Sequence, residues 1–199
     1  MHVYVLYAHP SRKSFNGAVL DAFTQGLRDA GHSYEIGDLY AMGFNPEMDL
    51  EQYERETGPD PEAAVPRDVR LEQERIDRAH GLAFIYPVWW GDCPAKLKGW
   101  FDRVLTHGYA YLYDQNQERG TRIEIQKAVV ICSAGHTVEH LEEIGIAESM
   151  RRIMLNDRLL GVGVKEARME ILGGMMPGDD SHRHGNLRRA YEIGLRLQE

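Results

Sequence analysis

The feature that most constrains the fold is an apolar run near the start of the chain that ends abruptly in a polar turn. Residues 3–7 (VYVLY) are β-branched, aliphatic or aromatic, which is typical of a strand buried on both faces in a parallel sheet. His9-Pro10-Ser11 cannot continue this strand, because Pro10 has no amide hydrogen for the sheet ladder. Residues 12–17 then supply hydroxyl and amide side chains of the kind that begin a helix. We therefore predict a strand, a tight turn and a helix start within residues 1–17.

The turn between this strand and this helix has the composition of an anion site. The first turn of a helix presents free backbone N–H groups and the positive end of the helix dipole, and both attract anions. His9, Arg12, Lys13 and Ser14 add cationic and hydroxyl groups at the same place. We interpret the turn as a phosphate site. The alternative is a capped helix with a solvated basic turn that binds nothing.

The change from an apolar strand to an unusual turn occurs twice more. Residues 82–86 end in Pro87-Val88-Trp89-Trp90-Gly91-Asp92, and residues 128–132 end in Ser133-Ala134-Gly135-His136-Thr137. Amphipathic helices separate the strands, and the clearest begins at Pro94. Strands that alternate with helices form right-handed βαβ units, so the sequence predicts an α/β fold with a five-stranded parallel sheet and helices on both faces. The other predicted elements are strands at 33–37 and about 167–172 and helices at about 15–30, 67–79, 137–160 and 186–198.

Length and charge limit the classes of protein to which the chain can belong. A chain of 199 residues is long enough to bury a sizeable core, and we expect residues 1–199 to form one domain with an irregular excursion at about 38–66. The net charge of −8 argues against a general binder of nucleic acids or acidic membranes, because a polyanion would meet a repulsive average surface. Any phosphate site must therefore be local.

Cysteine usage and the first residues indicate the compartment. Cys93 and Cys132 form no CxxC pair, and free thiols are typical of a reducing compartment. The opening MHVYVLY lacks the basic region of a signal peptide, and its apolar run is too short to span a membrane. We expect a cytoplasmic protein without membrane insertion. We also expect no metal site, since the polar segment Asp179–His184 is typical of a solvated turn.

The three unusual turns should meet at one place and bind one ligand. In a doubly wound parallel sheet, ligands bind outside the carboxyl ends of the strands. The first turn suits a phosphate, and the second offers the flat indoles of Trp89 and Trp90. No G-x-G-x-x-G motif follows the first strand, which disfavours a dinucleotide held in the Rossmann manner and favours a flavin nucleotide. The alternative for either indole is a place in the core or in a protein interface.

A series of short motifs extends along most of the chain, up to about Gly135. The motifs are His9 with Ser14-Phe15-Asn16, Asp38-Leu39-Tyr40-Ala41-Met42 with Phe44-Asn45-Pro46, Pro87 with Trp90, Pro94-Ala95 with Leu97-Lys98-Gly99-Trp100-Phe101, and Arg103-Val104. In this order and spacing they resemble the NAD(P)H:quinone oxidoreductase (DT-diaphorase) family, in its shorter bacterial form. The resemblance implies a flavodoxin-like, doubly wound, five-stranded parallel sheet with strand order 2-1-3-4-5.

The resemblance also implies roles for the three turns. The first would hold the flavin phosphate, the second the isoalloxazine and ribityl groups, and the third the polar edge of the ring, while two tyrosines would lie over the substrate pocket. It does not distinguish FMN from FAD. In the same order, the residues are His9, Ser14, Phe15 and Asn16; Pro87, Val88, Trp89 and Trp90; Ser133, Ala134, Gly135 and His136, up to Thr137; and Tyr111 and Tyr113.

The chain departs from mammalian members of this family at a charge relay made of a tyrosine and a histidine. The matching positions are Leu141 and Ala147, so that relay is missing. His136 or His140 could replace it, although neither stands at the matching position. His136 is the catalytic candidate that remains, and the flavin is expected to carry the chemistry.

The function implied by the resemblance is a two-electron transfer. NAD(P)H, either NADH or NADPH, would reduce the flavin and leave, and a quinone or similar small acceptor would take its place, which gives ping-pong kinetics. A homodimer is also implied, because the family completes this pocket from a second chain. One alternative is a regulatory flavoprotein that binds a membrane transporter or another partner through the 38–66 excursion. The other is a one-electron flavodoxin, which is disfavoured because the loop with Tyr111 and Tyr113 would cover the ring edge.

Overall fold

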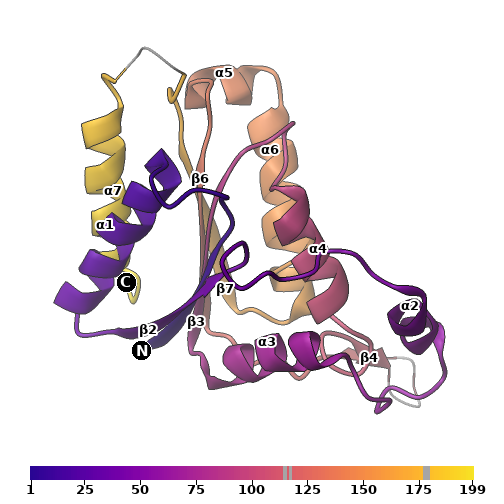
Figure 1. The fold of residues 1–199 in the computed structure, drawn as a ribbon. Coiled ribbons are helices and arrows are strands. Elements are labelled where there is room, and N and C mark those ends of the chain that lie inside the picture. The colour runs from indigo at the N-terminus through magenta and orange to yellow at the C-terminus, as the bar shows by residue number, and fades with distance from the viewer. Residues whose placement is uncertain (114–115, 117, 177–179) are drawn as a thin grey trace.

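Strands and helices alternate along the chain as the sequence predicts. A computed structural model describes residues 1–113, 116, 118–176 and 180–199 (Figure 1). In chain order the elements are β1 (His2–Tyr7), α1 (Phe15–Asp29), β2 (Ser33–Asp38), α2 (Leu50–Thr57), α3 (Arg67–Arg78), β3 (Gly81–Pro87), α4 (Ala95–Val104), β4 (Leu112–Tyr113), β5 (Arg119–Gly120), β6 (Lys127–Ser133), α5 (Val138–Glu143), α6 (Ile146–Arg151), the π-helix η1 (Arg152–Asp157), the 3-10 helix η2 (Leu160–Val162), β7 (Glu166–Leu172) and α7 (Arg183–Leu195).

Five parallel strands form the main sheet in the order β2-β1-β3-β6-β7. Counted within this sheet alone, the order is 2-1-3-4-5, which confirms the predicted order. In the centre, Val5 lies opposite Ile36 of β2 and Ala83 of β3. The chain moves outward from β1 to β2 and then returns to the other side of β1. This reversal places the switch point, where ligands bind in such sheets, between the carboxyl ends of β1 and β3.

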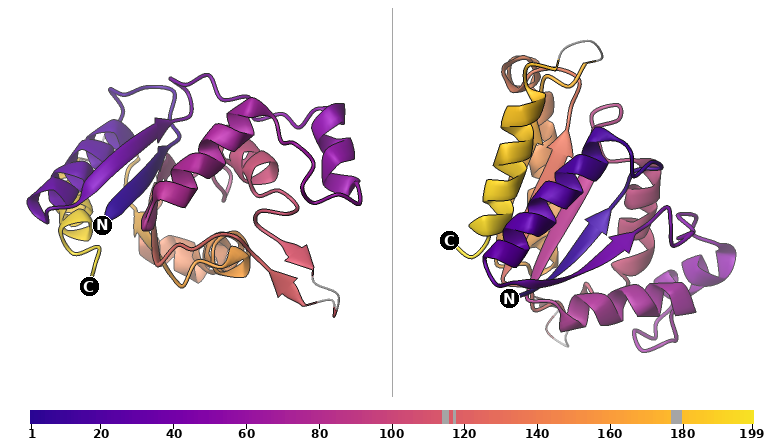
Figure 2. Two further views of the ribbon diagram at one scale, coloured as in Figure 1. Left: turned by 90° about the horizontal axis from the view of Figure 1, so that it is seen from below. Right: turned by 60° about the vertical axis from the view of Figure 1, so that its left-hand side comes forward.

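Helices cover both faces of the sheet. In Figure 1, α1 and α7 lie on one side and α3 to α6 on the other, and Figure 2 shows the same two layers from other directions. Successive residues of a strand point to opposite faces. Val5 and Tyr7 therefore pack in a cluster with α1 and α7, while Tyr4 and Leu6 pack in a second cluster with α3 and α4. The run at residues 3–7 is buried on both faces, as its composition predicts.

The 38–66 excursion is tied to the domain by buried side chains, and it contains the helix α2, which periodicity did not predict. The guanidinium of Arg103 pairs with Asp68 and donates to the carbonyl of Asn45 at 2.7 Å. Arg103 Nε also donates to the side-chain oxygen of Gln52, a residue of α2, at 2.8 Å. These contacts join the excursion to α3 and α4.

A buried carboxylate stabilises the side of the sheet covered by α3 and α4. Glu72 is 1% exposed, pairs with Arg75, and accepts hydrogen bonds from the Tyr4 hydroxyl at 2.5 Å and from Trp100 Nε1 at 2.8 Å. Burial and the adjacent Glu72 charge raise the pKa of Tyr4, so its hydroxyl remains a donor. All the polar groups of this cluster are therefore paired within one chain.

The single helix predicted at about 137–160 is wrong, because this segment is divided into α5, α6 and η1. Gly145 separates α5 from α6 with a φ of 75°, a left-handed conformation that no helix interior accommodates. The predicted aromatic loop is partly a strand, because Leu112 and Tyr113 form β4 of the antiparallel hairpin β4–β5, while Tyr111 before it makes an isolated bridge with His107. In the described part of the chain, no helix is long and apolar enough to cross a membrane.

Candidate functional site

The three unusual turns meet at the carboxyl ends of β1, β3 and β6. Asn16 Nδ2, from the first turn and helix, donates to Ser133 Oγ of the third turn at 2.8 Å. The Val88 N–H of the second turn donates to the Ser133 carbonyl, also at 2.8 Å. The ring of His9 lies 6.4 Å from that of Trp89, centroid to centroid. The structure thus brings together residues from three distant parts of the chain.

The first turn is built around the start of α1. Ser14 is the N-cap, and its Oγ accepts a hydrogen bond from the Gly17 N–H at 3.2 Å. Gly17 permits the turn to fold back onto the helix, since a Cβ there would lie 2.0 Å from the Arg12 carbonyl oxygen. The N–H groups of Phe15 and Asn16 stand in the first turn of the helix, where no helix carbonyl is in reach. These two N–H groups are therefore available to donate hydrogen bonds to an anion.

Tyr7 belongs to this turn, although the sequence indicated only a buried strand residue. Its hydroxyl donates to the Ser11 carbonyl at 3.1 Å and lies 3.3 Å from Ser14 Oγ. Burial raises the pKa of Tyr7, against smaller lowering effects of Ser14 and Arg12, so its hydroxyl stays protonated at neutral pH. Arg12 lies over the Tyr7 ring at 5.0 Å and pairs with Asp21 at 2.9 Å. The sequence indicated this contact with the first turn only through the place of Tyr7 at the end of the predicted strand.

Asn16 carries a buried acceptor without a donor. The residue is 4% exposed, its Nδ2 is used by Ser133, and its Oδ1 has no hydrogen-bond partner. Among the described residues, no other buried side-chain nitrogen or oxygen is left in this state. A buried acceptor without a donor costs free energy, and native proteins usually supply a water or a ligand group to it. The atom lies between the first and third turns, so it marks the centre of the candidate site.

The second turn presents both indoles to the outside. Pro87 ends β3 opposite Ser133 of β6, and the turn that follows carries Trp89, 43% exposed, and Trp90, 105% exposed. The core alternative is therefore wrong for both indoles, while the interface alternative remains. Trp90 has a φ of 52°, and it is the one non-glycine residue in the described ranges with a positive φ. Such strain is often found at functional sites.

The third turn is held against the segment after β7. The Ala134 carbonyl accepts from the Met175 N–H at 3.0 Å, and the His136 carbonyl accepts from the Gly174 N–H at 2.9 Å. Gly135 and His136 are exposed at the tip, while Ala134 is buried. The turn therefore offers an accessible backbone with its shape set by a neighbouring loop.

The positions that match the family's charge relay hold two buried aliphatic side chains. Leu141 and Ala147 are buried in the core on the α3–α6 side of the sheet. His136 and His140 are exposed, and their ring centroids are 4.8 Å apart. Leucine and alanine carry no titratable group, so a proton relay at these two positions is excluded by the residue types.

Tyr111 and Tyr113 lie just before and within the strand β4. Figure 1 shows the hairpin β4–β5, which contains Tyr113 and directly follows Tyr111, at the other end of the sheet from α5. Tyr111 stacks on His107 with ring centroids 5.5 Å apart, and Tyr113 is exposed. The structure thus brings the three turns together and places the hairpin away from the third turn.

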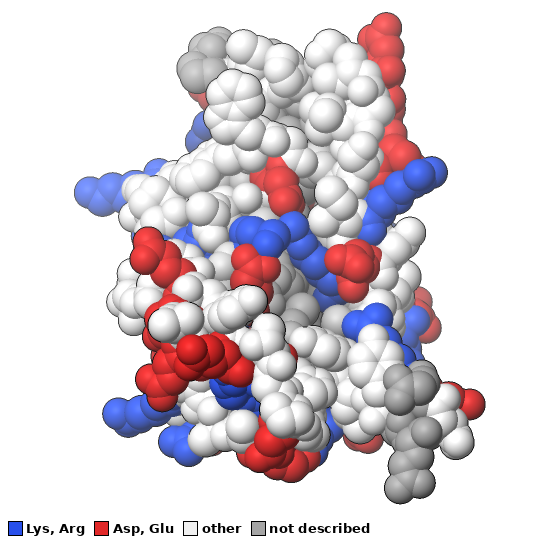
Figure 3. Space-filling model, turned by 90° about the vertical axis from the view of Figure 1, so that its right-hand side faces the viewer, with Lys and Arg blue, Asp and Glu red and all other residues white. Residues whose placement is uncertain are grey.

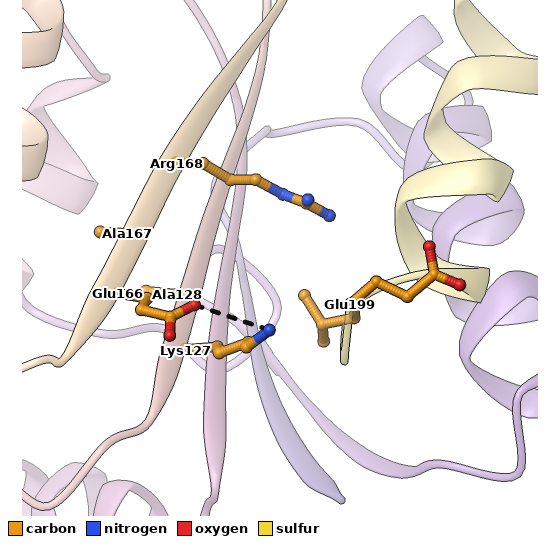
Figure 4. A pocket seen from close by; sticks show the side chains of 7 residues that line it. Lys127, Ala128, Glu166, Ala167, Arg168 and Glu199 are labelled. Carbon is orange, nitrogen blue, oxygen red and sulfur yellow. Dashed lines mark ion pairs between the residues drawn. The ribbon is translucent and has the colours of Figure 1, made fainter.

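A hollow outside the three turns, shown in Figure 4, lies at the amino-terminal ends of β6 and β7. Its volume is about 140 Å³, and its walls include Lys127, Glu166, Arg168 and Glu199. Lys127 Nζ pairs with Glu166 at 3.6 Å and donates to the Gln198 carbonyl at 2.8 Å. This hollow stands at the wrong end of the strands for a switch-point ligand. Of the Asp179–His184 segment, Asp179 lies outside the described residues.

The chain is similar in sequence and in structure to known proteins. The sequence profile for the flavodoxin-like fold matches residues 1–193. The solved structure of an NAD(P)H:quinone oxidoreductase from Methanothermobacter marburgensis is 65% identical in sequence, with a TM-score of 0.96, and the match covers 99% of this chain and 98% of that chain. The similarity therefore includes all three turns and the hairpin.

More distant relatives have related names. An "uncharacterized NAD(P)H oxidoreductase" of Haemophilus influenzae is 30% identical over 92% of this chain and 89% of its own length. NAD(P)H dehydrogenase (quinone) 1 of Cavia porcellus is 31% identical over 75% of this chain, and the match spans 59% of that protein. The chain belongs to the flavodoxin-like fold family, and the resemblance of its motifs to the NAD(P)H:quinone oxidoreductases is confirmed.

Proposed function

We propose that this protein is a flavin-dependent NAD(P)H oxidoreductase that transfers two electrons to a quinone or a similar small acceptor by a ping-pong mechanism. The observation that carries the proposal is the 65% identity, over 99% of the chain, to the NAD(P)H:quinone oxidoreductase of M. marburgensis. The meeting of three turns at the carboxyl ends of the strands supports a nucleotide site at the same place.

The residues at this place fit a flavin nucleotide. The start of α1, capped by Ser14, would hold the phosphate through its free N–H groups. Asn16 Oδ1 is a buried acceptor that a hydroxyl or N–H of the ligand would satisfy, and Trp89 and Trp90 would contact the ring. When bound, the flavin supplies the redox chemistry, taking a hydride from NAD(P)H and giving both electrons to the acceptor.

The residues of the chain would bind the flavin and orient it toward its substrates. Leu141 and Ala147 have aliphatic side chains, so these positions supply no proton for the reaction. His136 is the acid–base candidate of the third turn, where its exposed ring lies beside that of His140. The backbone of the third turn, fixed by its hydrogen bonds to residues 174 and 175, would present N–H groups in a set position.

The absorption spectrum of the purified protein tests this proposal. We expect a flavin spectrum, with the released cofactor identified as FMN or FAD by its mass. Steady-state assays with NADH or NADPH and a soluble benzoquinone should give parallel double-reciprocal lines, which indicate ping-pong kinetics. A folded protein that takes up neither flavin on reconstitution would exclude the proposal.

We further propose that two chains form a homodimer that completes the pocket. The hairpin β4–β5, which contains Tyr113 and directly follows Tyr111, lies at the other end of the sheet from α5, which follows the third turn (Figure 1). This separation supports a pocket that two chains share. A twofold axis would bring the hairpin of one chain to the turns of the other. The exposed side chains of Trp90 and Ile144 support an apolar contact. Figure 3 shows one face whose upper part carries few charged side chains except along its edge.

Complementation between two variants tests the homodimer. One variant carries Trp90→Ala, and the other carries Tyr111→Ala with Tyr113→Ala; each should have little activity alone. In a heterodimer one pocket combines the two intact parts, so co-expressed chains should regain about 25% of the wild-type activity. No recovery in isolated heterodimers, or full activity in a monomer by light scattering, would exclude the shared pocket.

We also propose a cytoplasmic location. Cys93 and Cys132 are buried and free, and burial raises the pKa of each thiol to about 12. Two unreactive free thiols suit a reducing compartment. Fractionation of the producing cells should recover the protein with cytoplasmic markers, and recovery with membranes or secreted proteins would contradict this location.

A further inference from the structure

The turn from Trp89 to Asp92 has a strained backbone. The Trp89 N–H donates to the Asp92 carbonyl at 2.9 Å, and the Asp92 N–H donates to the Trp89 carbonyl at 3.2 Å. Between them, Trp90 and Gly91 have φ values of 52° and 78°, the combination that a type I′ turn requires. Glycine adopts this conformation freely, whereas tryptophan adopts it only under strain. Surrounding contacts must therefore hold the turn.

Arg158, the residue after the π-helix η1, supplies such contacts. Its two terminal nitrogens donate to the two carboxylate oxygens of Asp92, both at 2.9 Å. The guanidinium also lies over the ring of Phe101 at 5.3 Å and donates to Cys93 Sγ at 3.5 Å. The Arg158 side chain is only 9% exposed. A bidentate pair of this kind fixes the orientation of the carboxylate as well as its position.

Asp92 transmits this restraint to the turn. Its Oδ1 accepts a hydrogen bond from the Cys93 N–H at 2.7 Å, while its backbone closes the turn against Trp89. A carboxylate held from two sides cannot rotate away without breaking both sets of bonds. The arginine directly follows a π-helix, a rare element that frequently occurs at functional sites.

We propose that Arg158 is a positioning residue that acts through Asp92 to hold Trp89 and Trp90 in the conformation that receives the flavin ring. The inference rests on the proposed flavin function. In this proposal Arg158 does not contact the flavin. It keeps the turn ordered in the free protein, so that flavin binding carries no further entropic cost of ordering the turn. Loss of Arg158 should therefore weaken flavin binding independently of its effect on stability.

Arg103 provides a matched control for the chemistry of this pair. It is also buried, donates to both oxygens of Asp68 at 2.5 and 3.0 Å, and lies over an aromatic ring, that of Phe44, at 5.4 Å. Its contacts hold the 38–66 excursion and none of the three turns. Arg103→Met thus removes an equivalent ion pair from another place.

Arg158→Met is the test variant, because it removes the buried cation and leaves Asp92, whose side chain is 40% exposed, to be solvated by water. Asp92→Ala would instead leave a buried arginine unpaired. Binding of FMN to the apoproteins is measured by quenching of flavin fluorescence, and stability by the thermal midpoint. Tryptophan fluorescence anisotropy of the apoprotein reports the mobility of the turn without ligand, and the visible spectrum of bound FMN reports its environment.

We expect Arg158→Met to raise the Kd for FMN about 10-fold, which corresponds to about 1.4 kcal/mol. It should also lower the tryptophan anisotropy and alter the spectrum of bound FMN, whereas Arg103→Met should lower the thermal midpoint and leave these readouts unchanged. Arg158→Lys keeps the cation but not the bidentate geometry, so its Kd for FMN should lie between those of wild type and Arg158→Met. If Arg158→Met does not fold, Arg158→Lys serves as the test variant.

Two results would overturn the inference. If Arg158→Met and Arg158→Lys bind FMN as wild type does, the pair is structural, and the proposed function stands. If Arg103→Met weakens FMN binding as much as Arg158→Met does, the loss of affinity follows from general destabilisation of the protein. Failure of the wild-type protein to bind FMN or FAD is a different outcome, since it removes the proposed function and the inference with it.

Discussion

Two regions of the molecule differ in how fully their polar side chains are hydrogen-bonded. One is the flank formed by α2, α3 and α4, and the other is the set of turns at the carboxyl ends of the strands. In the flank, Glu72 has partners for both oxygens, and Arg103 donates to three other residues. At the turns, Asn16 Oδ1 is buried without a donor, and Trp90 is both strained and fully exposed. The flank is complete within one chain, and the turns are not.

This difference separates residues that stabilise the fold from residues that await a ligand. An unpaired buried acceptor and a left-handed tryptophan both cost stability, and selection retains such features where function needs them. Substitutions in the flank should therefore change stability and leave flavin binding unchanged. Substitutions in the turns should change flavin binding with little loss of stability.

The largest effect is expected from Ser14→Asp at the start of α1. Aspartate is a good N-cap, so it should keep the hydrogen bond to the Gly17 N–H and the stability of the apoprotein. At an effective dielectric constant of about 20 and a separation of about 4 Å, its charge would repel a phosphate charge by about 4 kcal/mol, roughly a thousandfold in affinity. The purified variant should be folded and colourless.

Ser14→Asn is the matched control for Ser14→Asp, since asparagine caps a helix equally well and carries no charge. It should retain much more flavin than the aspartate variant in the same fluorescence titration. A yellow, active Ser14→Asp protein would show that this turn holds no phosphate.

Glu72→Ala should have the next largest effect, on stability alone. It leaves the Tyr4 hydroxyl and Trp100 Nε1 without their acceptor and removes the partner of Arg75, so we expect a loss of about 3 kcal/mol in the free energy of unfolding. Urea unfolding measures this loss, and FMN titration of the folded fraction should give the wild-type Kd. Glu74→Ala, at an exposed ion pair on the same helix, is the control and should change stability by under about 0.5 kcal/mol. A weaker Kd in Glu72→Ala would remove the contrast between the two regions.

Trp90→Gly should separate stability from binding at one position. Glycine adopts the left-handed conformation without strain, so the apoprotein should be about 1 kcal/mol more stable than Trp90→Ala, which keeps the strain. Both variants lose the indole and should bind flavin about 2 kcal/mol more weakly than wild type, roughly 30-fold in Kd. Unfolding curves and FMN titrations of the pair measure the two effects. Wild-type flavin affinity in both variants would assign Trp90 to the protein interface alone.

The smallest expected effect is on acid stability. Burial alone would raise the pKa of Asp92, but hydrogen bonds from Arg158 and from the Cys93 N–H hold it below the ordinary value of 3.8. A carboxyl whose pKa is lower in the folded state stabilises the protein above 3.8, and this contribution is lost as the pH falls through the folded pKa. The difference in thermal midpoint between wild type and Arg158→Met should therefore shrink below pH 3.8. A difference that stays constant through this range would show that Asp92 contributes no pH-dependent stability through Arg158.

Local patterns in the sequence predicted most elements closely. The strand predicted at 82–86 is β3, Gly81–Pro87, and the helix predicted at 67–79 is α3, Arg67–Arg78. These predictions succeed because buried runs and amphipathic periods are properties of neighbouring residues. The helix predicted at 137–160 fails because Gly145 interrupts it, and α2 was missed because its segment shows no sustained apolar period.

The sequence by itself determined which strands end in unusual turns, and hence which residues could form a site. Only the tertiary structure decided which of them meet: Asn16 reaches Ser133 across 117 positions, and Arg158 reaches Asp92 across 66. Periodicity records which face of an element is buried. The partners of a polar side chain depend instead on how helices pack on the sheet, which no local pattern contains.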